Sequence, residues 1–282
     1  MDSNSNADSR AVRARGLHYR YPDGTSGLTS VDWEVGAGER WGMIGANGSG
    51  KSTLLQHLAG VHPADGHLWI FGREARKREL PAIRRDVGFL FQDPEDQLFL
   101  PTVGEDVAFG PRNAGFAEGE VAARVSSALQ RLEIEHLRDR PTHRLSGGEK
   151  QSAAIASVLA LEPRLLILDE PTNDLDPSAR RRLERFLAGW TGTLIVATHD
   201  LEFLLGTVSQ IAILDGGACA EVGAARDLLV GEERLARYGL EEPPSLRALR
   251  KAQVNPRLAF PIEDPDPPGK RSPSIDSTPD EP

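Results

Sequence analysis

The chain has 282 residues, a formal net charge of −9 and one cysteine, Cys219. This length predicts one large or two modest domains with a substantial hydrophobic core, and the acidic balance provides no broad positive field to attract nucleic acid. A single cysteine excludes an internal disulfide and argues against a cysteine-rich metal site. No apolar run approaches the roughly 20 residues that cross a bilayer, and no secretion signal is recognisable, so we expect a cytoplasmic chain.

The two ends of the chain differ in composition from the middle. Residues 1–10 are rich in Ser, Asn and Asp, and the sequence from 241 onward is rich in proline. Segments with so few apolar side chains cannot offset the entropy lost on ordering. We therefore predict a disordered N-terminus at 1–10, one folded domain at 11–240, and a disordered tail at 241–282.

The segment between the ends alternates short apolar runs with helical patterns. A mixture of this kind predicts an α/β fold around a mostly parallel sheet. Apolar strand-like runs disappear over 93–162, which we interpret as a helical insert in that fold. The predicted strands cover 41–45, 164–169, 193–198 and 211–215, and the helices cover 52–60, 120–134 and 177–190.

The stretch GANGSGKST follows a predicted strand and opens a predicted helix. Its glycines allow a tight turn that presents backbone N–H groups to phosphate oxygens, and the helix N-terminus adds about +0.5 of a charge. Lys51 is placed to reach the β- and γ-phosphates, and the Ser52 hydroxyl to bind Mg²⁺. The spacing predicts a site for a nucleoside triphosphate at Gly45, Ala46, Asn47, Gly48, Ser49, Gly50, Lys51, Ser52 and Thr53.

Two further strand ends carry polar side chains. Asp169 and Glu170 end the apolar run LLILDE, at the sheet edge where ligands of such folds bind. Asp169 suits the Mg²⁺-side carboxylate, and Glu170 suits a base that aligns or deprotonates a water; a plain strand terminus is the alternative. His199 follows the next apolar run and is placed to reach the γ-phosphate or the water. The remaining histidines are expected to be structural: His18, His57, His62, His67, His136 and His143.

The stretch RLSGGEKQ, residues 144–151, is a second potential anion-binding helix N-terminus. One chain that folds around one nucleotide has no evident use for a second cradle. With this motif the sequence resembles the ATP-binding-cassette (ABC) ATPase family from about residue 12 to 240. The resemblance implies a P-loop NTPase of the ABC type, with an antiparallel N-terminal β part, a parallel core and a helical insert.

The same resemblance assigns roles to residues that the local patterns leave open. Tyr21 would stack on adenine, with His18 and Tyr19 as neighbouring alternatives. Gln92 would form the glutamine loop that joins the core to the insert and would bind Mg²⁺ or the water. Asp176 would lie at the seam of a dimer. The signature would contact the γ-phosphate of the partner's ATP through Ser146, Gly147 and Gly148.

The implied assembly is a pair of ATPase subunits, expected to be a homodimer, with ATP as substrate and Mg²⁺ as cofactor. Ser152 departs from the pattern, because many relatives have a basic residue there. This change removes no catalytic group, but it can alter helix packing or coupling.

FQDPEDQLF and PTVGEDVAFGP resemble the ATPases of energy-coupling-factor importers, in which this region forms the groove for coupling helices of a membrane subunit. Phe91, Leu98 and Phe99 with an acidic rim would suit an amphipathic helix that carries basic residues. The alternative is that these side chains only fix the insert to the core. YPDG and DVAFGPRN most resemble the cobalt and nickel branch, in which two copies of one ATPase serve one transporter.

The leading hypothesis is the ATP-hydrolysing subunit of an energy-coupling-factor importer that takes up cobalt or nickel. It would lie at the cytoplasmic face of the cell membrane, with a second ATPase subunit and integral membrane subunits as partners and no nucleic acid. The alternatives are a vitamin importer of the same type and a soluble ABC ATPase that acts in iron–sulfur assembly or on nucleic acid. A regulator that binds nucleotide without hydrolysis is disfavoured by Glu170 and His199.

Overall fold

The computed structural model describes residues 10–64 and 67–255. The predicted disordered segments at 1–9 and beyond 255 lie outside this range. Within it, no helix combines the length and the apolar character that a bilayer crossing requires.

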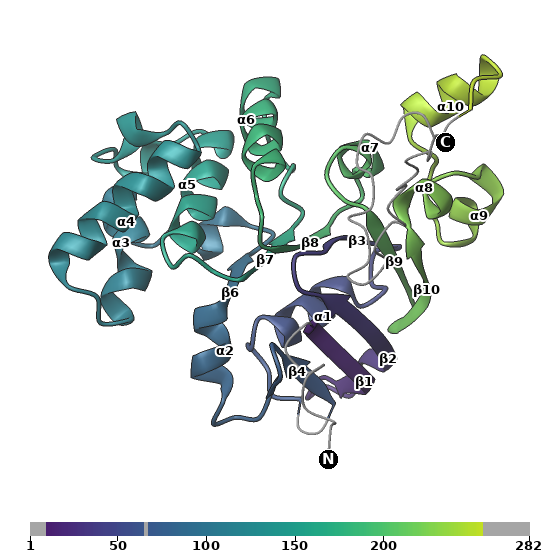
Figure 1. Ribbon diagram of the computed structural model, residues 1–282, viewed down its shortest axis with the longest axis horizontal. Helices are drawn as coiled ribbons and strands as arrows, with labels where there is room; N and C mark the ends of the chain where they lie inside the picture. The colour runs from purple at the N-terminus through teal and green to yellow at the C-terminus, as the bar shows by residue number, and fades with distance from the viewer. Residues whose placement is uncertain (1–9, 65–66, 256–282) are drawn as a thin grey trace, which may run out of the picture.

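A ten-stranded mixed sheet organises the molecule (Figure 1). The strand order is β5-β4-β1-β2-β10-β9-β3-β8-β7-β6. Strands β9, β3, β8, β7 and β6 are mutually parallel, whereas β2, β1, β4 and β5 pair antiparallel. The strands are β1 Arg10–Arg20, β2 Ser26–Gly36, β3 Arg40–Ile44, β4 Leu68–Ile70, β5 Arg73–Glu74, β6 Val87–Leu90, β7 Leu165–Asp169, β8 Thr193–Ala197, β9 Gln210–Asp215 and β10 Ala218–Ala224.

The secondary structure between β6 and β7 is helical. Its helices α3, α4 and α5 gather in one lobe at the left of Figure 1. Helices α3 and α5 each begin at a capping box. At α3, the Thr102 hydroxyl accepts from the backbone N–H of Glu105, and the Glu105 carboxylate accepts from the backbone N–H of Thr102. Ser146 and Glu149 form the same pair of hydrogen bonds at α5. The segments of this lobe are η1 Pro94–Asp96, α3 Val103–Asn113, α4 Glu118–Arg131, η2 Glu135–Leu137, η3 Thr142–Arg144 and α5 Gly147–Leu159.

The other helices surround the sheet. They are α1 Lys51–Leu58, α2 Leu80–Asp86, α6 Pro177–Ala188, α7 Leu201–Leu205, α8 Ala225–Leu228, α9 Glu232–Arg237 and α10 Pro244–Lys251. The predicted α/β fold, with a mostly parallel core, an antiparallel N-terminal part and a helical insert, is confirmed by this architecture.

Two hydrophobic cores lie on opposite faces of the parallel strands, as the alternation along β7 illustrates. Leu166 and Leu168 pack in the core shared with the helical lobe, whereas Leu165 and Ile167 pack in the core shared with the antiparallel strands. Helix α1 contacts both β2 and β7, so the helix that follows the phosphate loop is fixed between the two parts of the sheet.

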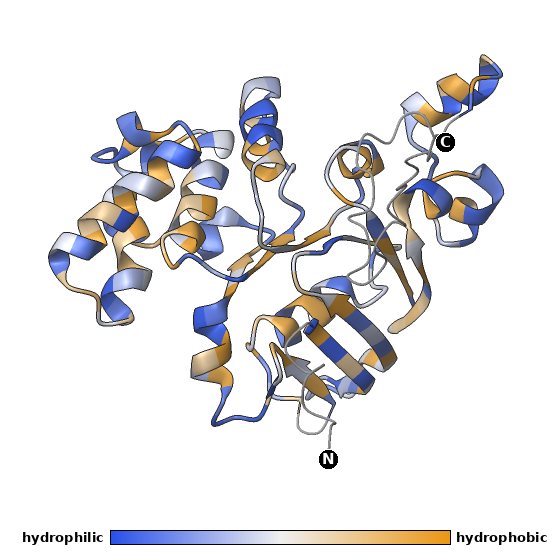
Figure 2. Ribbon diagram, viewed as in Figure 1, coloured by the Kyte–Doolittle hydropathy of each residue, from blue (hydrophilic) through white to orange (hydrophobic). Residues whose placement is uncertain are grey.

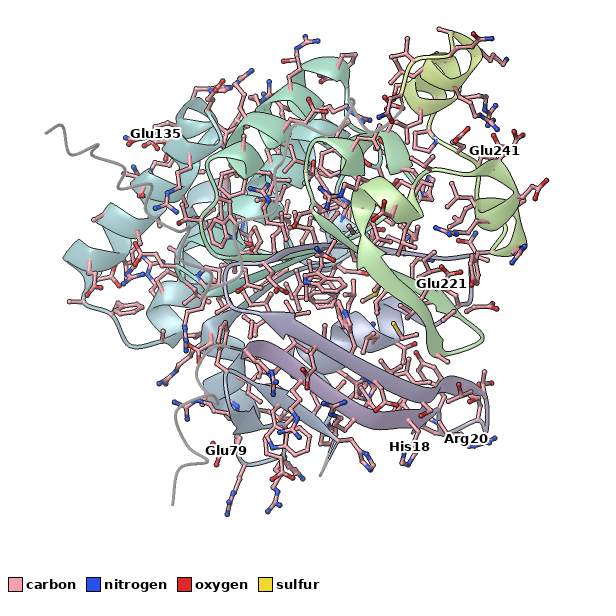
Figure 3. All side chains as sticks on the ribbon, turned by 45° about the vertical axis from the view of Figure 1, so that its right-hand side comes forward. His18, Arg20, Glu79, Glu135, Glu221 and Glu241 are labelled. Atoms are coloured by element: carbon pink, nitrogen blue, oxygen red, sulfur yellow. The ribbon has the colours of Figure 1, made fainter. Side chains whose placement is uncertain are left out.

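Hydropathy follows this arrangement. Apolar residues concentrate on the central strands and on the inner sides of the helices (Figure 2). The polar residues labelled in Figure 3 lie at the edges of the molecule: His18, Arg20, Glu79, Glu135, Glu221 and Glu241.

The predicted boundary at residue 240 is wrong, because the ordered chain continues through α10. The Leu246 side chain is fully buried, and the Glu242 side chain is almost so. Glu242 accepts from the backbone N–H of Gly231 at 3.1 Å and pairs with Arg250 at 2.9 Å. A few well-placed apolar residues therefore hold a segment whose average composition predicts disorder.

Replacing Leu246 by Ala should destabilise the protein by about 2–4 kcal/mol, because it leaves a cavity at a fully buried position. Lys251→Ala, at an exposed position of the same helix, should change the free energy of unfolding by less than about 0.5 kcal/mol. Denaturant unfolding of both variants measures the difference. Equal stabilities would mean that α10 does not belong to the folded unit.

Candidate functional site

The phosphate loop connects β3 to α1 through backbone geometry that requires glycine. Gly45 has a φ of +151°, and a Cβ there would lie 2.2 Å from the carbonyl oxygen of Leu214. Gly50 has a φ of +101°, and its Cβ would lie 2.8 Å from the carbonyl oxygen of Gly27. Any side chain at these positions would force the loop away from the sheet edge.

Lys51 begins α1 and folds back over the loop. Its ammonium donates to the carbonyl oxygens of Gly45 at 2.8 Å and Ala46 at 3.1 Å. Burial lowers the pKa of Lys51, and the nearby carboxylates Glu170 and Asp169 oppose that shift. The positive charge is thus held in the centre of the predicted phosphate site by neutral backbone oxygens.

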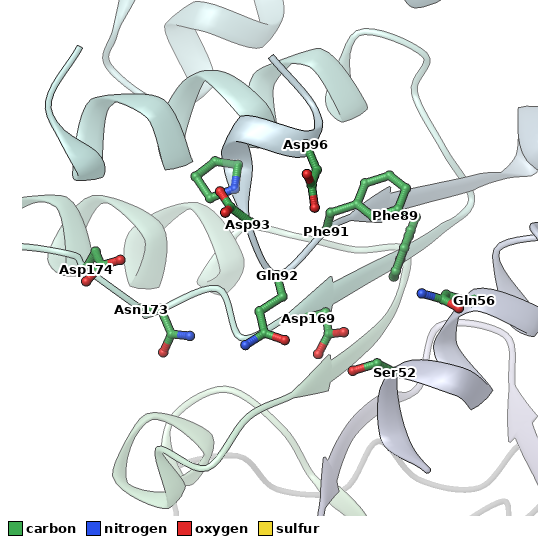
Figure 4. A pocket seen from close by; sticks show the side chains of 11 residues that line it. Ser52, Gln56, Phe89, Phe91, Gln92, Asp93, Asp96, Asp169, Asn173 and Asp174 are labelled. Atoms are coloured by element: carbon green, nitrogen blue, oxygen red, sulfur yellow. The ribbon is translucent and has the colours of Figure 1, made fainter. Parts of the chain in front are cut away.

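Three side chains beside the loop carry oxygen atoms that can act as metal ligands: Asp169, Ser52 and Gln92. Figure 4 shows the carboxylate, hydroxyl and amide facing one another across the same cleft, which the three residues line. Burial raises the pKa of Asp169 to about 6, against a hydrogen bond from Ser52 that lowers it. Hard oxygen donors of this kind fit Mg²⁺. Within the described ranges no cluster of three or more His, Cys, Asp or Glu side chains could hold a metal ion alone.

Glu170 is held in one orientation by its neighbours on the next strand end. Its Oε2 accepts from the Thr198 hydroxyl at 2.9 Å and lies 2.9 Å from Nδ1 of His199. The Glu170 residue is 8% exposed, whereas the His199 side chain is 68% exposed. The carboxylate therefore lies at the floor of the site and the imidazole at its mouth.

Thr198 is a site residue that the sequence analysis missed. It is fully buried, and its hydroxyl also accepts from the backbone N–H of Asp200 at 3.0 Å. The sequence feature that pointed to this role is a hydroxyl-bearing residue placed between an apolar strand and His199.

The three aromatic side chains considered for the adenine contact, Tyr21, Tyr19 and His18, have different surroundings. Tyr21 lines a cleft of about 490 Å³ together with the phosphate loop and Glu170, and its hydroxyl lies 2.7 Å from that of Thr53. The Tyr19 ring instead packs against His57, with ring centroids 4.6 Å apart. The His18 ring packs against His67 at 4.8 Å.

The signature forms a second, separate cluster at the N-terminus of α5. Figure 1 places that helix in the lobe apart from α1 and the phosphate loop. Asp176 belongs to this cluster, because a Cβ on Gly148 would lie 3.7 Å from its Oδ2. Asp176 also caps α6 by accepting from the backbone of Ser178 and Ala179. One chain therefore presents two distinct sites: the phosphate-loop cleft and the signature with Asp176.

Ser152, the departure from the family pattern, is accommodated inside α5. Its buried hydroxyl donates to the carbonyl oxygen of Gly148 at 2.9 Å, one turn earlier. The small side chain fits a helix that is buried along most of its length.

Phe91, Leu98 and Phe99 were predicted to form one apolar groove, but they lie on different surfaces. Of the three, only Phe99 lines the apolar groove of the structure. Phe99 is 62% exposed, and its ring is in edge-to-face contact with that of Phe109, with ring centroids 4.9 Å apart. Leu98 packs against the core of the helical lobe, and Phe91 lines the cleft beside Gln92. The prediction that all three share the groove is wrong: the short helix η1 separates Phe91 from the other two, and Leu98 lines a different pocket from Phe99. The groove is lined by Val87, Phe89, Phe99, Asp106, Phe109 and Leu161, among others.

Comparison with known proteins identifies the family. The family described as ABC transporter has a sequence profile that matches residues 28–173. An ABC transporter ATP-binding protein from Geobacter sulfurreducens is 44% identical over 237 residues, which covers 84% of this chain and 95% of that protein. The chain belongs to the ABC transporter family. It is an ABC ATPase, the ATP-binding subunit of a transporter.

Two other similarities bear on the subfamily. An energy-coupling factor transporter ATP-binding protein from Methanothermobacter thermautotrophicus is 39% identical over 249 residues, covering 86% of this chain and 80% of that protein. The structure of CbiO1 from Clostridium perfringens, described as part of the ABC transporter complex CbiONQ, has a TM-score of 0.72 and 32% identity and covers 89% of this chain and 98% of that chain.

A further solved structure is a dimer. The ATP-binding cassette MJ0796, in a post-hydrolysis state bound to ADP and Pi, has a TM-score of 0.70 and 26% identity, covering 76% of this chain and 98% of that chain. The resemblance to the ABC ATPases and to energy-coupling-factor ATPases is confirmed by these comparisons.

Replacing Thr198 by Val should destabilise the ABC ATPase by about 1–3 kcal/mol, because the buried Glu170 carboxylate loses a donor and the part-buried backbone N–H of Asp200 loses its acceptor. It should also lower ATP turnover by about tenfold or more, because Glu170 loses the donor that orients its carboxylate. Thr198→Ser keeps the hydroxyl and serves as the control for both readouts. Turnover that is equal in the Val and Ser variants would remove Thr198 from the site.

Proposed function

We propose that this chain is the ATP-hydrolysing subunit of an energy-coupling-factor type importer and works as a homodimer with two shared ATP sites. The observation that carries this proposal is the separation of the two clusters. The phosphate loop, Asp169 and Glu170 line one cleft, whereas the α5 N-terminus lies in another lobe. A second copy can bring its signature to the first copy's phosphates, so that both clusters are used.

The phosphate-loop cleft would hold Mg²⁺ and ATP. Ser52 and Asp169 would bind the ion directly, and Gln92 would join them when the insert lies close to the core. The ion would neutralise charge on the β- and γ-phosphates. Lys51 would exchange its two backbone acceptors for phosphate oxygens, which keeps its charge compensated in both states.

The catalytic assignment rests on Glu170 and His199. Glu170 would align or deprotonate the attacking water, and the Thr198 hydroxyl holds its carboxylate for that task. His199 would contact the γ-phosphate from the mouth of the site, where its imidazole is exposed. Tyr21 would stack on the adenine, and its hydrogen bond with Thr53 would keep the ring beside the phosphate loop.

The apolar groove is the proposed contact with the membrane subunits. Large apolar side chains exposed on a soluble protein mark interaction surfaces, and Phe99 and Phe109 form such a pair. Asp106 lies beneath the same groove, where its buried carboxylate accepts from the backbone N–H groups of Phe99 and Leu100 and so fixes the segment that carries Phe99. This contact would place the chain at the cytoplasmic face of the membrane.

The class of importer follows from similarity. The relative from Methanothermobacter thermautotrophicus carries the energy-coupling factor name, and the CbiO1 structure belongs to a CbiONQ complex. With the cobalt and nickel resemblance of YPDG and DVAFGPRN, these favour uptake of a transition metal ion over uptake of a vitamin. The solute itself would be recognised by another polypeptide.

The variant Glu170→Gln should cut ATP turnover by on the order of a hundredfold or more and accumulate an ATP-bound dimer. Turnover and size-exclusion chromatography with ATP and Mg²⁺ measure both effects. Lys51→Ala should instead weaken nucleotide binding, so that no dimer accumulates in the Glu170→Gln background. Hydrolysis within a few-fold of the wild type in Glu170→Gln would refute the base assignment.

Phe99→Glu should reduce recovery of polytopic membrane proteins with the tagged chain by about tenfold or more, because a charge would enter an apolar contact. Mild-detergent extraction and mass spectrometry measure the recovery. Val222→Glu is the matched control, since Val222 is also an exposed apolar residue, at 54%, but lies on β10. Recovery of only soluble partners with the wild type would contradict the importer assignment and leave the ATPase intact.

A further inference from the structure

The ring of Tyr21, the proposed adenine contact, packs against a group of further aromatic rings. Tyr19 lies in β1 and Tyr21 directly follows that strand, and their rings meet edge to face with centroids 5.0 Å apart. His57 of α1 and His62 of the loop after α1 both contact Tyr19, with ring centroids 4.6 and 5.2 Å away. These four residues are called the aromatic cluster below.

Thr53, on the first turn of α1, joins the aromatic cluster to the phosphate loop. Its hydroxyl lies 2.7 Å from the hydroxyl of Tyr21. Its carbonyl oxygen lies 2.8 Å from Nδ1 of His57, one turn later in the same helix. A carbonyl oxygen can only accept, so His57 carries a proton on Nδ1. Two members of the cluster are therefore bonded to the same residue of the predicted nucleotide site.

The backbone of β2 packs closely against the aromatic cluster. A Cβ on Gly27 would lie 2.8 Å from Cε2 of Tyr21, 3.0 Å from Cγ2 of Thr53 and 3.3 Å from Cδ1 of Tyr19. A side chain at this position would displace the tyrosine rings. The Tyr21 ring is thus held by the β2 backbone, by the Tyr19 ring and by the hydroxyl of Thr53.

His57 is suited to its position as a neutral side chain. It is 1% exposed, and burial lowers its pKa, an effect that outweighs the opposing hydrogen bond to Thr53 and that His62 reinforces. The neutral imidazole donates from Nδ1 and packs its ring against Tyr19 without placing a charge in the core. His57 does not line the cleft of Tyr21 and the phosphate loop. Any effect of His57 on a bound nucleotide must therefore pass through Tyr21 or Thr53.

We propose that His57 is a positioning residue for the adenine contact, which together with Tyr19 fixes the Tyr21 ring in the orientation that a base requires. The proposal rests on the proposed function, in which Tyr21 stacks on adenine. Stacking needs the face of the ring to meet the base, and a ring that is free to rotate loses entropy when it is ordered by a ligand. A ring that is already fixed avoids this loss, so His57 raises affinity for ATP without contacting it.

A merely structural role for His57 would have a different consequence. His57 belongs to the helix that begins with Lys51, so a loosened helix would weaken every ligand that binds through its phosphates. A positioning role affects only ligands that carry a base. Inorganic tripolyphosphate has the three phosphates of ATP without base or ribose, so the ratio of the two affinities separates the roles.

The test measures binding of the β,γ-imido analogue of ATP and of inorganic tripolyphosphate to the full-length protein with Mg²⁺. Tyr21→Ala should weaken binding of the analogue by about tenfold or more and leave that of tripolyphosphate within about twofold. His57→Leu keeps a buried side chain of similar size and removes both the donor and the aromatic ring. It should weaken binding of the analogue by about fivefold, with tripolyphosphate again within about twofold.

The double variant of His57→Leu and Tyr21→Ala isolates the route of the effect. In the Tyr21→Ala background, His57→Leu should change neither affinity by more than about twofold, because the ring that His57 positions is absent. Tyr19→Leu removes the ring between His57 and Tyr21 and leaves α1 unchanged, so it should repeat the effect of His57→Leu. If His57→Leu does not fold, Tyr19→Leu decides the question by the same readouts.

His18→Leu is the matched control. His18 precedes Tyr19 in β1, but it is exposed and its ring contacts His67 instead of the aromatic cluster. This variant should match the wild type for both ligands.

Three results would overturn the inference. They are a His57→Leu variant with the analogue affinity of the wild type, a proportional loss of affinity for the analogue and for tripolyphosphate, and a further loss of about fivefold in the Tyr21→Ala background. Failure of His57→Leu alone leaves the adenine contact standing. If Tyr21→Ala does not change the ratio of the two affinities, the adenine contact of the proposed function is wrong, and the inference is overturned with it.

Discussion

Three ionisable side chains are buried together at the carboxyl edge of the parallel strands, and the site depends on their mutual compensation. Lys51, Asp169 and Glu170 are each less than 10% exposed. Burial works against the charge on two of them, lowering the pKa of Lys51 and raising that of Asp169 to about 6. Fixed dipoles reduce this cost: carbonyl oxygens of the loop accept from the lysine, and the Thr198 hydroxyl donates to Glu170. The site is therefore organised before any nucleotide enters it.

This organisation requires a rigid base. The five parallel strands place the phosphate loop, Asp169 and Thr198 at the same edge, because β3 lies beside β8 and β8 beside β7. The close approach of Gly45 to the carbonyl oxygen of Leu214 holds the loop against the next strand. The signature is attached in a different way. It begins α5, a helix that contacts β6 and packs in the hydrophobic core shared by the helical lobe and the sheet.

Much of this arrangement could be predicted from the sequence, because the informative residues are local. A glycine-rich turn between an apolar strand and a helix predicts a phosphate loop, and carboxylates at the end of LLILDE predict a site at the sheet edge. The roles of individual side chains in catalysis stay predictions, although the structure brings them into one cleft.

Other features were inaccessible because they depend on contacts between distant segments. Helix α10 was missed since average composition does not reveal that Leu246 meets a buried surface. Phe91 and Phe99 were assigned to one groove since spacing alone does not show that η1 turns the chain between them. Gln97 was not distinguished from the polar residues around it, because its acceptors on α5 lie 57 and 60 residues further along the chain.

Helix α5 is joined to the segments that follow Gln92 and Glu170 mainly by neutral hydrogen bonds. A buried ion pair would be costly to separate, since each charge would lose its partner in a medium of low polarity. The neutral amides of Gln97 and Gln151 bind backbone carbonyls and a hydroxyl instead, and each such bond contributes only about 0.5–1.5 kcal/mol. The charged contact between Lys150 and Glu95 lies at the surface, where the Glu95 side chain is 68% exposed and water can replace its partner. These two segments are thus held against α5 by bonds of modest individual strength, with the charged one at the surface.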